Sequence, residues 1–226
     1  MKNKITFLSI VFLAFTFTVS AHQPRLVFDE ANSEQNPFVI NNPDISQAFY
    51  GEFKNNEPEY FRVTLPQEMS FYLSLLVPDN QNASKEVSAI MIKLNSPESS
   101  IPLSLSGKNF DWKKYYEEFA GDNYLQGPSE EKILPAGEYL IKVESKDNVG
   151  KYVVVIGKIE SFPFMESVKT IFALPDLKME FFETSFFSVF SGIIGKGLLI
   201  LIVIIIILIF GIYKIIKFIL RTRKNI

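Results

Sequence analysis

Apolar and polar residues alternate along much of the middle of the chain. Phe61, Val63 and Leu65 occupy every second position of one segment, and Phe71 and Leu73 begin the same pattern in the next. A period of two predicts β-strands, because successive side chains of a strand point to opposite faces. Residues that favour turns bound each segment. The strands predicted in this way are 48–53, 59–65, 70–77, 88–94, 101–105, 138–144 and 151–158.

These strands predict an all-β fold class, an antiparallel β-sandwich of jelly-roll-like form. No helix of ordinary length separates them between residues 48 and 158, which favours a sandwich over a parallel α/β sheet. The short connection at 66–68 predicts that 59–65 and 70–77 pair as an antiparallel hairpin. A polar turn at 145–150 joins the last two predicted strands.

One segment departs from the strand pattern. Trp112, Tyr115, Tyr116 and Phe119 recur at the spacing of one face of a helix, which predicts a short helix or turn over 111–120. Exposed rings suit a sugar or a partner protein, whereas buried rings suit the open end of a sandwich core, and the spacing favours the core. If the rings are exposed, the expected binding residues are Trp112, Tyr115, Tyr116 and Tyr124.

Each end of the chain carries a continuous apolar run. Residues 1–21 begin with Lys2 and Lys4, continue without charge from 5 to 19 and end in small residues, the pattern of a secretory signal peptide. Residues 197–213 also carry no charge, and apolar flanks extend them to 193–216, long enough for a transmembrane helix. A buried soluble helix is disfavoured, because this second run is apolar on every face.

Charge sets the predicted orientation in the membrane. Residues 22–185 hold all 25 acidic residues against 15 basic ones, a net charge of −10. So acidic a domain argues against nucleic acid as a partner, since affinity for phosphates comes from clustered Lys and Arg. The residues after the second apolar run are basic with no acid, so the positive-inside tendency places the C-terminus in the cytoplasm and the acidic domain outside the cell membrane.

These features predict a single-pass membrane protein without disulfides. The chain contains no Cys, so the domain relies on core burial alone. Asn82 begins a glycosylation motif that matters only in a eukaryotic host. The predicted segments are a signal peptide (1–21), an N-terminal extension (22–45), a β-sandwich ectodomain (46–160), a juxtamembrane stalk (161–192), a transmembrane helix (193–216) and a basic cytoplasmic tail (217–226).

Two strand openings carry a family resemblance. Residues 134–139 have the sequence LPAGEY, and residues 150–152 have the sequence GKY. Residues 46–160 thereby resemble the bacterial pre-peptidase C-terminal-like domain. The resemblance implies a jelly-roll-like sandwich that accompanies secreted enzymes and has no catalytic residues of its own. This sequence departs from the common arrangement, because a predicted membrane anchor takes the place of a peptidase domain.

The residue types leave few catalytic options. The chain has one His, His22, and no Cys, so a His-based triad and a typical zinc site both lack their residues. Copper binding at His22 as a mature N-terminus would need a second His. We therefore predict no catalytic residues, no metal and no cofactor. A Ser/Lys dyad or a carboxylate pair stays open as a hydrolase alternative, and Asp- and Asn-rich loops such as 79–82 leave a structural calcium open.

The segment before the apolar helix is rich in Phe. It also contains two pairs of small residues, Ser188/Gly192 and Ser191/Gly195, that suit close contact with a second helix. The predicted function is a non-catalytic binding or assembly module on a membrane protein. Expected partners are the membrane and a surface glycan or another membrane protein. The alternatives are an accessory subunit of a membrane complex and a tethered hydrolase of surface polysaccharide or peptide.

Overall fold

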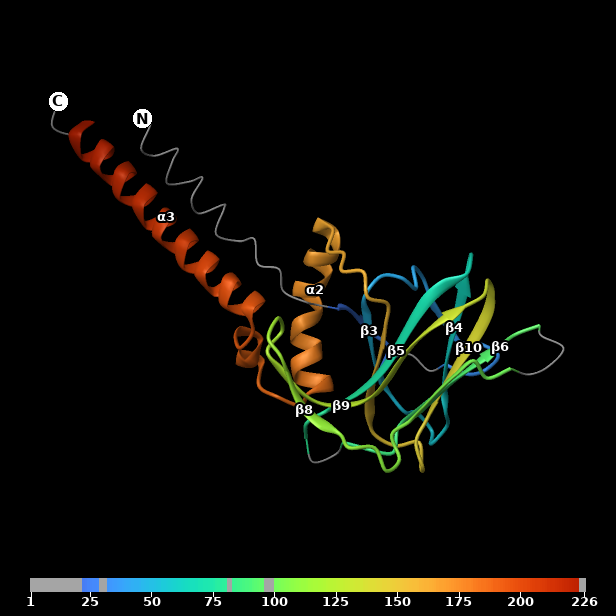
Figure 1. The fold of residues 1–226 in the computed structure, drawn as a ribbon. Coiled ribbons are helices and arrows are strands. Elements are labelled where there is room, and N and C mark those ends of the chain that lie inside the picture. The colour runs from blue at the N-terminus through green and yellow to red at the C-terminus, as the bar shows by residue number, and fades with distance from the viewer. Residues whose placement is uncertain (1–21, 29–31, 81–82, 96–99, 224–226) are drawn as a thin grey trace.

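The structure, a computed structural model, describes residues 22–28, 32–80, 83–95 and 100–223. The predicted signal peptide and Asn82 lie outside these residues. Two β-sheets pack face to face (Figure 1). The first sheet has the spatial order β1 (Gln23–Leu26), β3 (Gln47–Glu52), β11 (Lys151–Ile156), β5 (Met69–Pro78), β9 (Asp122–Leu134) and β8 (Lys113–Glu117). The second has the order β2 (Phe38–Ile40), β4 (Glu59–Leu65), β10 (Gly137–Glu144), β6 (Ser88–Lys93) and β7 (Leu103–Ser106).

Both sheets are mainly antiparallel, which confirms the predicted all-β sandwich. Only β1 with β3 and β2 with β4 pair in parallel among the described strands. These two short strands, β1 and β2, come from residues 22–45, the predicted N-terminal extension. That segment therefore supplies one edge strand to each sheet.

The predicted strands are confirmed as β3, β4, β5, β6, β7, β10 and β11, with ends shifted by up to two residues. The predicted hairpin is wrong. The strand β4 pairs with β2 and β10, whereas β5 pairs with β9 and β11 in the other sheet. The connection 66–68, like the turn 145–150, therefore crosses between sheets. Local alternation identifies the buried face of a strand but leaves its neighbour unspecified.

The helix or turn predicted over 111–120 is also wrong. Residues Lys113–Glu117 form the edge strand β8, which pairs antiparallel with β9. Hydrogen bonding to a neighbouring strand overrides the helical spacing of the aromatic residues. The partner β9 escaped prediction because Gly127 and Pro128 interrupt it and residues 129–133 are polar or exposed without alternation.

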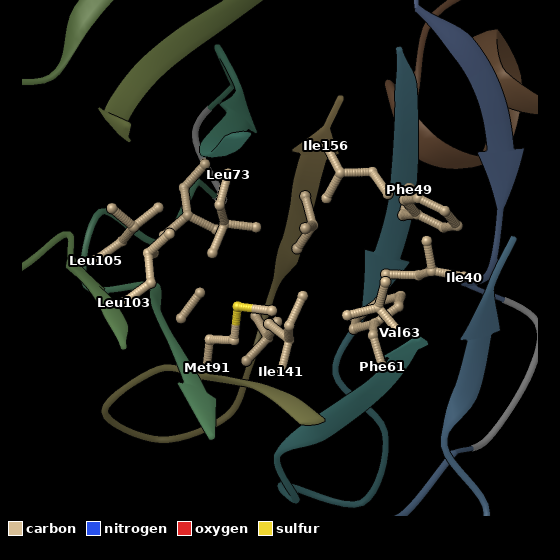
Figure 2. Close-up of a cluster of buried hydrophobic side chains, with 14 of the residues drawn as sticks. Ile40, Phe49, Phe61, Val63, Leu73, Met91, Leu103, Leu105, Ile141 and Ile156 are labelled. Atoms are coloured by element: carbon tan, nitrogen blue, oxygen red, sulfur yellow. The ribbon is translucent and has the colours of Figure 1, made fainter. Parts of the chain in front are cut away.

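The main core lies between the two sheets (Figure 2). Phe49 and Ile156 of the first sheet point toward Phe61 and Ile141 of the second, and these side chains are almost wholly buried. Burying one such side chain contributes about 1.5–3 kcal/mol. The core therefore stabilises the sandwich without the disulfides that the sequence cannot supply.

A second apolar cluster covers the outer face of the first sheet. Residues 161–192, the predicted stalk, fold here into α2 (Phe164–Asp176), the π-helical turn η1 (Leu177–Phe181) and the 3-10 turn η2 (Phe186–Phe190). Phe181 and Phe182 pack on Tyr50, Tyr124 and Val153 of that sheet. The segment is thus part of the folded domain.

The last helix, α3 (Ile193–Arg223), projects away from the sandwich (Figure 1). Of the helices in the described ranges, it is the one long and apolar enough to cross a membrane, over Ile193–Thr222. Its apolar side chains are mostly exposed from Leu199 onward. The predicted transmembrane segment 193–216 falls within it.

Candidate functional site

A solvent-open groove of about 660 Å³ lies at one end of the sandwich. Four separate segments line it: residues 42–44, the end of β4 with its connection to β5 and the start of β5, Glu131 of β9, and residues 157–159 after β11. We call it the β5 groove. Its polar lining includes Asp44, Gln67, Ser70, Tyr72, Glu131 and Lys158.

The groove exists because β11 does not extend along the first residues of β5. Pairing between the two strands stops at Leu73 and Ile156, although β5 begins at Met69. Gly157 then turns the chain with a φ of +66°, and a Cβ there would lie 2.2 Å from the Ile45 carbonyl oxygen. Glycine is therefore required at this position.

The chain that follows β11 is held on the far side of the groove. The amides of Lys158 and Ile159 donate to the Asp44 carbonyl oxygen at 3.1 and 3.0 Å. Ile159 also bridges to Ile45 in parallel. These bonds fix the backbone of residues 158–159 against residues 44–45, so this side of the groove stays apart from β5.

An ion pair lies within the groove. Lys158 donates to Glu131, and its ammonium also lies 5.0 Å from the centroid of the Tyr72 ring. The Ser70 hydroxyl donates to Glu131 Oε1 at 2.8 Å. The hydrogen bonds from Lys158 and then Ser70 lower the pKa of the Glu131 carboxyl, so it is ionised at neutral pH. Because the Ser70 proton is directed to a carboxylate and not to Lys158, these residues lack the contact that a Ser/Lys dyad needs.

The four predicted aromatic binding residues do not form one surface. Trp112 packs against the core between the sheets and donates from Nε1 to the Gly107 carbonyl at 3.0 Å. Tyr124 is 2% exposed, and its hydroxyl lies 2.9 Å from that of Tyr50. Tyr115 stacks near Tyr124, with ring centroids 6.2 Å apart.

Tyr116 differs from its neighbours because it follows Tyr115 along β8 and points to the opposite face. It is 48% exposed. Of the four residues, it alone offers an open ring. Binding by these four residues stays a prediction. None of them lines the β5 groove, whose aromatic lining residue is Tyr72.

A second, much smaller cavity of about 30 Å³ lies between α2 and the first sheet. His22 lies there, held through Nδ1 at 2.5 Å from Ser46 Oγ, and burial lowers its pKa. The Thr170 hydroxyl lines the same cavity without a hydrogen-bond partner. A space of this size holds about one water molecule and is too small for a larger ligand.

Metal binding has little support in the described part of the chain. No group of three or more His, Cys, Asp or Glu side chains there is placed to hold a metal ion. Two acids from the loops considered for calcium are in ion pairs, Asp79 with Lys114 at 3.1 Å and Asp122 with Lys178 at 2.5 Å.

The sequence did not predict the buried ion pair between Lys178 and Asp122. Lys178 lies in η1, is fully buried and donates to Asp122 and to the carbonyl oxygen of Ala120 at 2.8 Å. Burial raises the pKa of Asp122, although Lys178 opposes this rise. A single Lys in an amphipathic stretch is typical of a solvated surface, so its sequence context offered no signal.

The small residues around the start of α3 make contacts within the chain. Ser191 donates to the Gly121 carbonyl oxygen at 3.1 Å. A Cβ on Gly192 would lie 2.3 Å from the Ala120 carbonyl carbon, and a Cβ on Gly195 would meet the Val189 carbonyl oxygen. Ser191 and Gly192 therefore hold the start of α3 against the β8–β9 turn, and Gly195 packs against η2. Contact with a second helix at these residues stays a prediction.

Comparison with known proteins identifies no family. No protein family model and no curated protein matches the sequence. Among solved structures, the pre-peptidase C-terminal domain of a Bacillus anthracis collagenase is 9% identical, with a TM-score of 0.37 over 56% of this chain and 99% of that one. The periplasmic inhibitor of g-type lysozyme PliG from Aeromonas hydrophila is 9% identical, with a TM-score of 0.35 over 61% and 98%.

A third similar structure is the surface-associated copper-binding protein CorA of Methylomicrobium album BG8. It is 8% identical, with a TM-score of 0.26 over 62% of this chain and 99% of that one. One of the three structures belongs to the family that residues 46–160 resemble, and membership of that family stays a prediction. At these TM-scores the similarities carry no argument about function, and the fold assignment rests on the strand pairing of this chain.

Proposed function

We propose that this chain is a single-pass membrane protein whose extracytoplasmic β-sandwich is a non-catalytic binding module, with the β5 groove as its binding site. The observation that carries the proposal is the groove itself. Its volume of about 660 Å³ lies within the range of ligand sites, and it combines apolar walls with a few fixed polar groups.

The helix α3 supports the membrane anchor in this proposal. Its exposed apolar surface has no covering partner among the described residues, and hydrocarbon is the solvent that such a helix requires. The basic residues that follow the apolar run favour a cytoplasmic C-terminus. The sandwich then lies on the opposite side.

Assembly with another membrane protein is a second candidate function. Phe164, Phe172 and Phe187, in the segment that precedes α3, have exposed side chains, each more than three quarters accessible. Exposed aromatic residues of this size mark contact surfaces for proteins or lipids. This candidate uses a different surface from the groove, so the two are separable.

A photocrosslinking experiment tests the groove as the binding site. A photoreactive amino acid replaces Gln67 at the rim of the groove, and a matched variant carries it at Lys146, an exposed residue in the turn that precedes β11. The proposal predicts that full-length protein in native membranes crosslinks to one specific species from position 67 and not from 146. Equal labelling from both positions, or none from 67, contradicts it.

Assembly is tested with the same design on the other surface. A photoreactive residue at Phe187 is expected to crosslink to a membrane protein if the chain is an accessory subunit. Crosslinks from Gln67 alone favour the binding module, and crosslinks from Phe187 alone favour the subunit.

A further inference from the structure

One side of the β5 groove is the start of β5, which forms an open edge of the first sheet. Neighbours flank β5 on both sides from Leu73 to Leu76, where β9 and β11 pair with it. Gly157 still donates to the Tyr72 carbonyl oxygen, so only over residues 69–71 is β9 the one remaining neighbour, with Met69 facing Leu134. On the groove side, this part of β5 has no adjoining strand within the described residues.

The hydrogen-bonding direction of this edge follows from one contact. The amide of Gly157 donates to the Tyr72 carbonyl oxygen at 3.4 Å, so the backbone groups of Tyr72 point toward the β11 side. In a strand, these groups alternate between the two sides with a period of two. The amide and carbonyl of Ser70 therefore also point to that side, into the groove. The irregular pairing between Ser74 and Leu76 lies further along β5 and does not alter this alternation.

We propose that the β5 groove binds an extended peptide segment of a partner protein, which adds to β5 as a new strand beside Ser70. This inference rests on the proposed function and names the ligand class of that site. Residues 69–71 span about 10 Å as a strand, enough for three ligand residues. Strand addition gains affinity from backbone hydrogen bonds and selectivity from pockets for alternate side chains.

The lining of the groove indicates which peptides it accepts. Lys158 compensates Glu131, whereas Asp44 is in no ion pair with any described residue, which leaves one uncompensated acid. Met69 and Ile159 add apolar surface, and the Ile159 side chain is more than half exposed. The groove therefore favours a segment that combines apolar side chains with a Lys or Arg. The Lys158 ammonium over the Tyr72 ring occupies the aromatic face on which a sugar would stack.

The test uses full-length protein in lipid nanodiscs and a displayed library of random linear 12-residue peptides, with empty nanodiscs for counter-selection. Enriched peptides are synthesised, and binding is measured by fluorescence polarisation. The variant Ser70→Pro removes the amide that faces the groove, and proline is tolerated at an edge position. The control Ser70→Ala keeps the amide and loses only the hydroxyl bond to Glu131. We expect at least a tenfold loss of affinity for Ser70→Pro and less than a threefold loss for Ser70→Ala.

A second measurement does not depend on how the protein variant folds. Each backbone amide of the best peptide is methylated in turn, and binding to wild-type protein is measured. Strand addition predicts that losses alternate with a period of two along the three ligand residues that lie beside β5. No enriched peptide, losses without alternation, or binding of neutral oligosaccharides in place of peptides would overturn the inference. Specific crosslinks from Gln67 alongside those outcomes would leave the proposed function standing.

Discussion

Glu59 is a carboxyl group buried in the sandwich. It is 2% exposed, accepts a hydrogen bond from the Tyr152 hydroxyl at Oε2, and has no described partner at Oε1. Burial raises its pKa from 4.5 to about 7, although the bond from Tyr152 and the charge of Lys54 oppose the rise. The fold therefore favours the protonated form.

This raised pKa predicts how stability depends on pH. Between pH 4.5 and 7 the folded protein binds the Glu59 proton more tightly than the unfolded chain, so this contribution to stability falls as pH rises and is lost above about pH 7. Glu59→Gln removes the charge and keeps the shape. We expect it to flatten the change in thermal stability between pH 5 and 8. At pH 8 it should stabilise the protein by roughly 2 kcal/mol, less than the full shift because the buried amide of Gln still lacks a partner for one polar atom.

The control for Glu59 is Glu68→Gln, in the exposed connection before β5. It should leave the pH dependence as in the wild type. If Glu59→Gln and wild type lose stability in parallel from pH 5 to 8, Glu59 is ionised in the fold and the assignment is wrong.

Replacing only one partner of the buried ion pair between Lys178 and Asp122 should destabilise the fold. Lys178→Met leaves the Asp122 carboxylate buried, and Oδ2 of that carboxylate already lacks a described hydrogen-bond partner. We expect a loss of about 3–5 kcal/mol in the free energy of unfolding, and recovery of most of it in the double variant Lys178→Met with Asp122→Leu. Chemical denaturation of the detergent-solubilised protein measures both. Lys169→Met, at an exposed surface pair, is the control and should change stability by less than about 1 kcal/mol.

Among the structural elements, the junction of α3 with the β8–β9 turn is defined by backbone contacts. The amides of Ile193 and Ile194 donate to the carbonyl oxygens of Glu118 and Phe119 at 3.0 and 3.1 Å. Gly192 permits this approach, since a Cβ there would overlap the backbone of Ala120. The contact joins the first turn of α3 directly to the sandwich.

Gly192→Ala is predicted to open this junction. The added Cβ forces the turn away from α3, so the amides of Ile193 and Ile194 should exchange hydrogen at least tenfold faster, while the core strands keep their protection. Hydrogen exchange read by mass spectrometry on peptides from 186–196 measures this. Gly211→Ala is the matched control, because a Cβ there meets no atom within 4 Å. Unchanged exchange in Gly192→Ala would show that the junction does not constrain α3.

The sequence predicted the strands in which buried and exposed side chains alternate. It did not predict strands whose formation depends on pairing with a neighbouring strand. The pattern Phe61, Val63 and Leu65 carries its own signal, because each second side chain enters the core. The strand β9 carries none over 129–133, and β8 shows a helical spacing that only its pairing overrides. The β5 groove was also beyond prediction, since it arises where Gly157 leads the chain away from β5 toward Asp44.

At the scale of the whole molecule, the chain joins two parts with opposite requirements for solvent. The sandwich with its covering helices belongs to the segment of net charge −10, and α3 presents apolar side chains on all sides. Water suits the first part and lipid the second. In the proposed membrane-anchored form, the junction at Gly192 sets the orientation of the β5 groove to the membrane surface.

The absence of Cys from the sequence makes the topology directly measurable. Single-cysteine variants Lys146→Cys, in the exposed turn before β11, and Thr222→Cys, near the end of α3, are treated with a membrane-impermeant maleimide in cells with an intact cytoplasmic membrane. The account predicts labelling at position 146 before lysis and at position 222 only after permeabilisation. Labelling of 222 but not 146 in intact cells, or of both together, would contradict a membrane-anchored module that lies outside the cytoplasm.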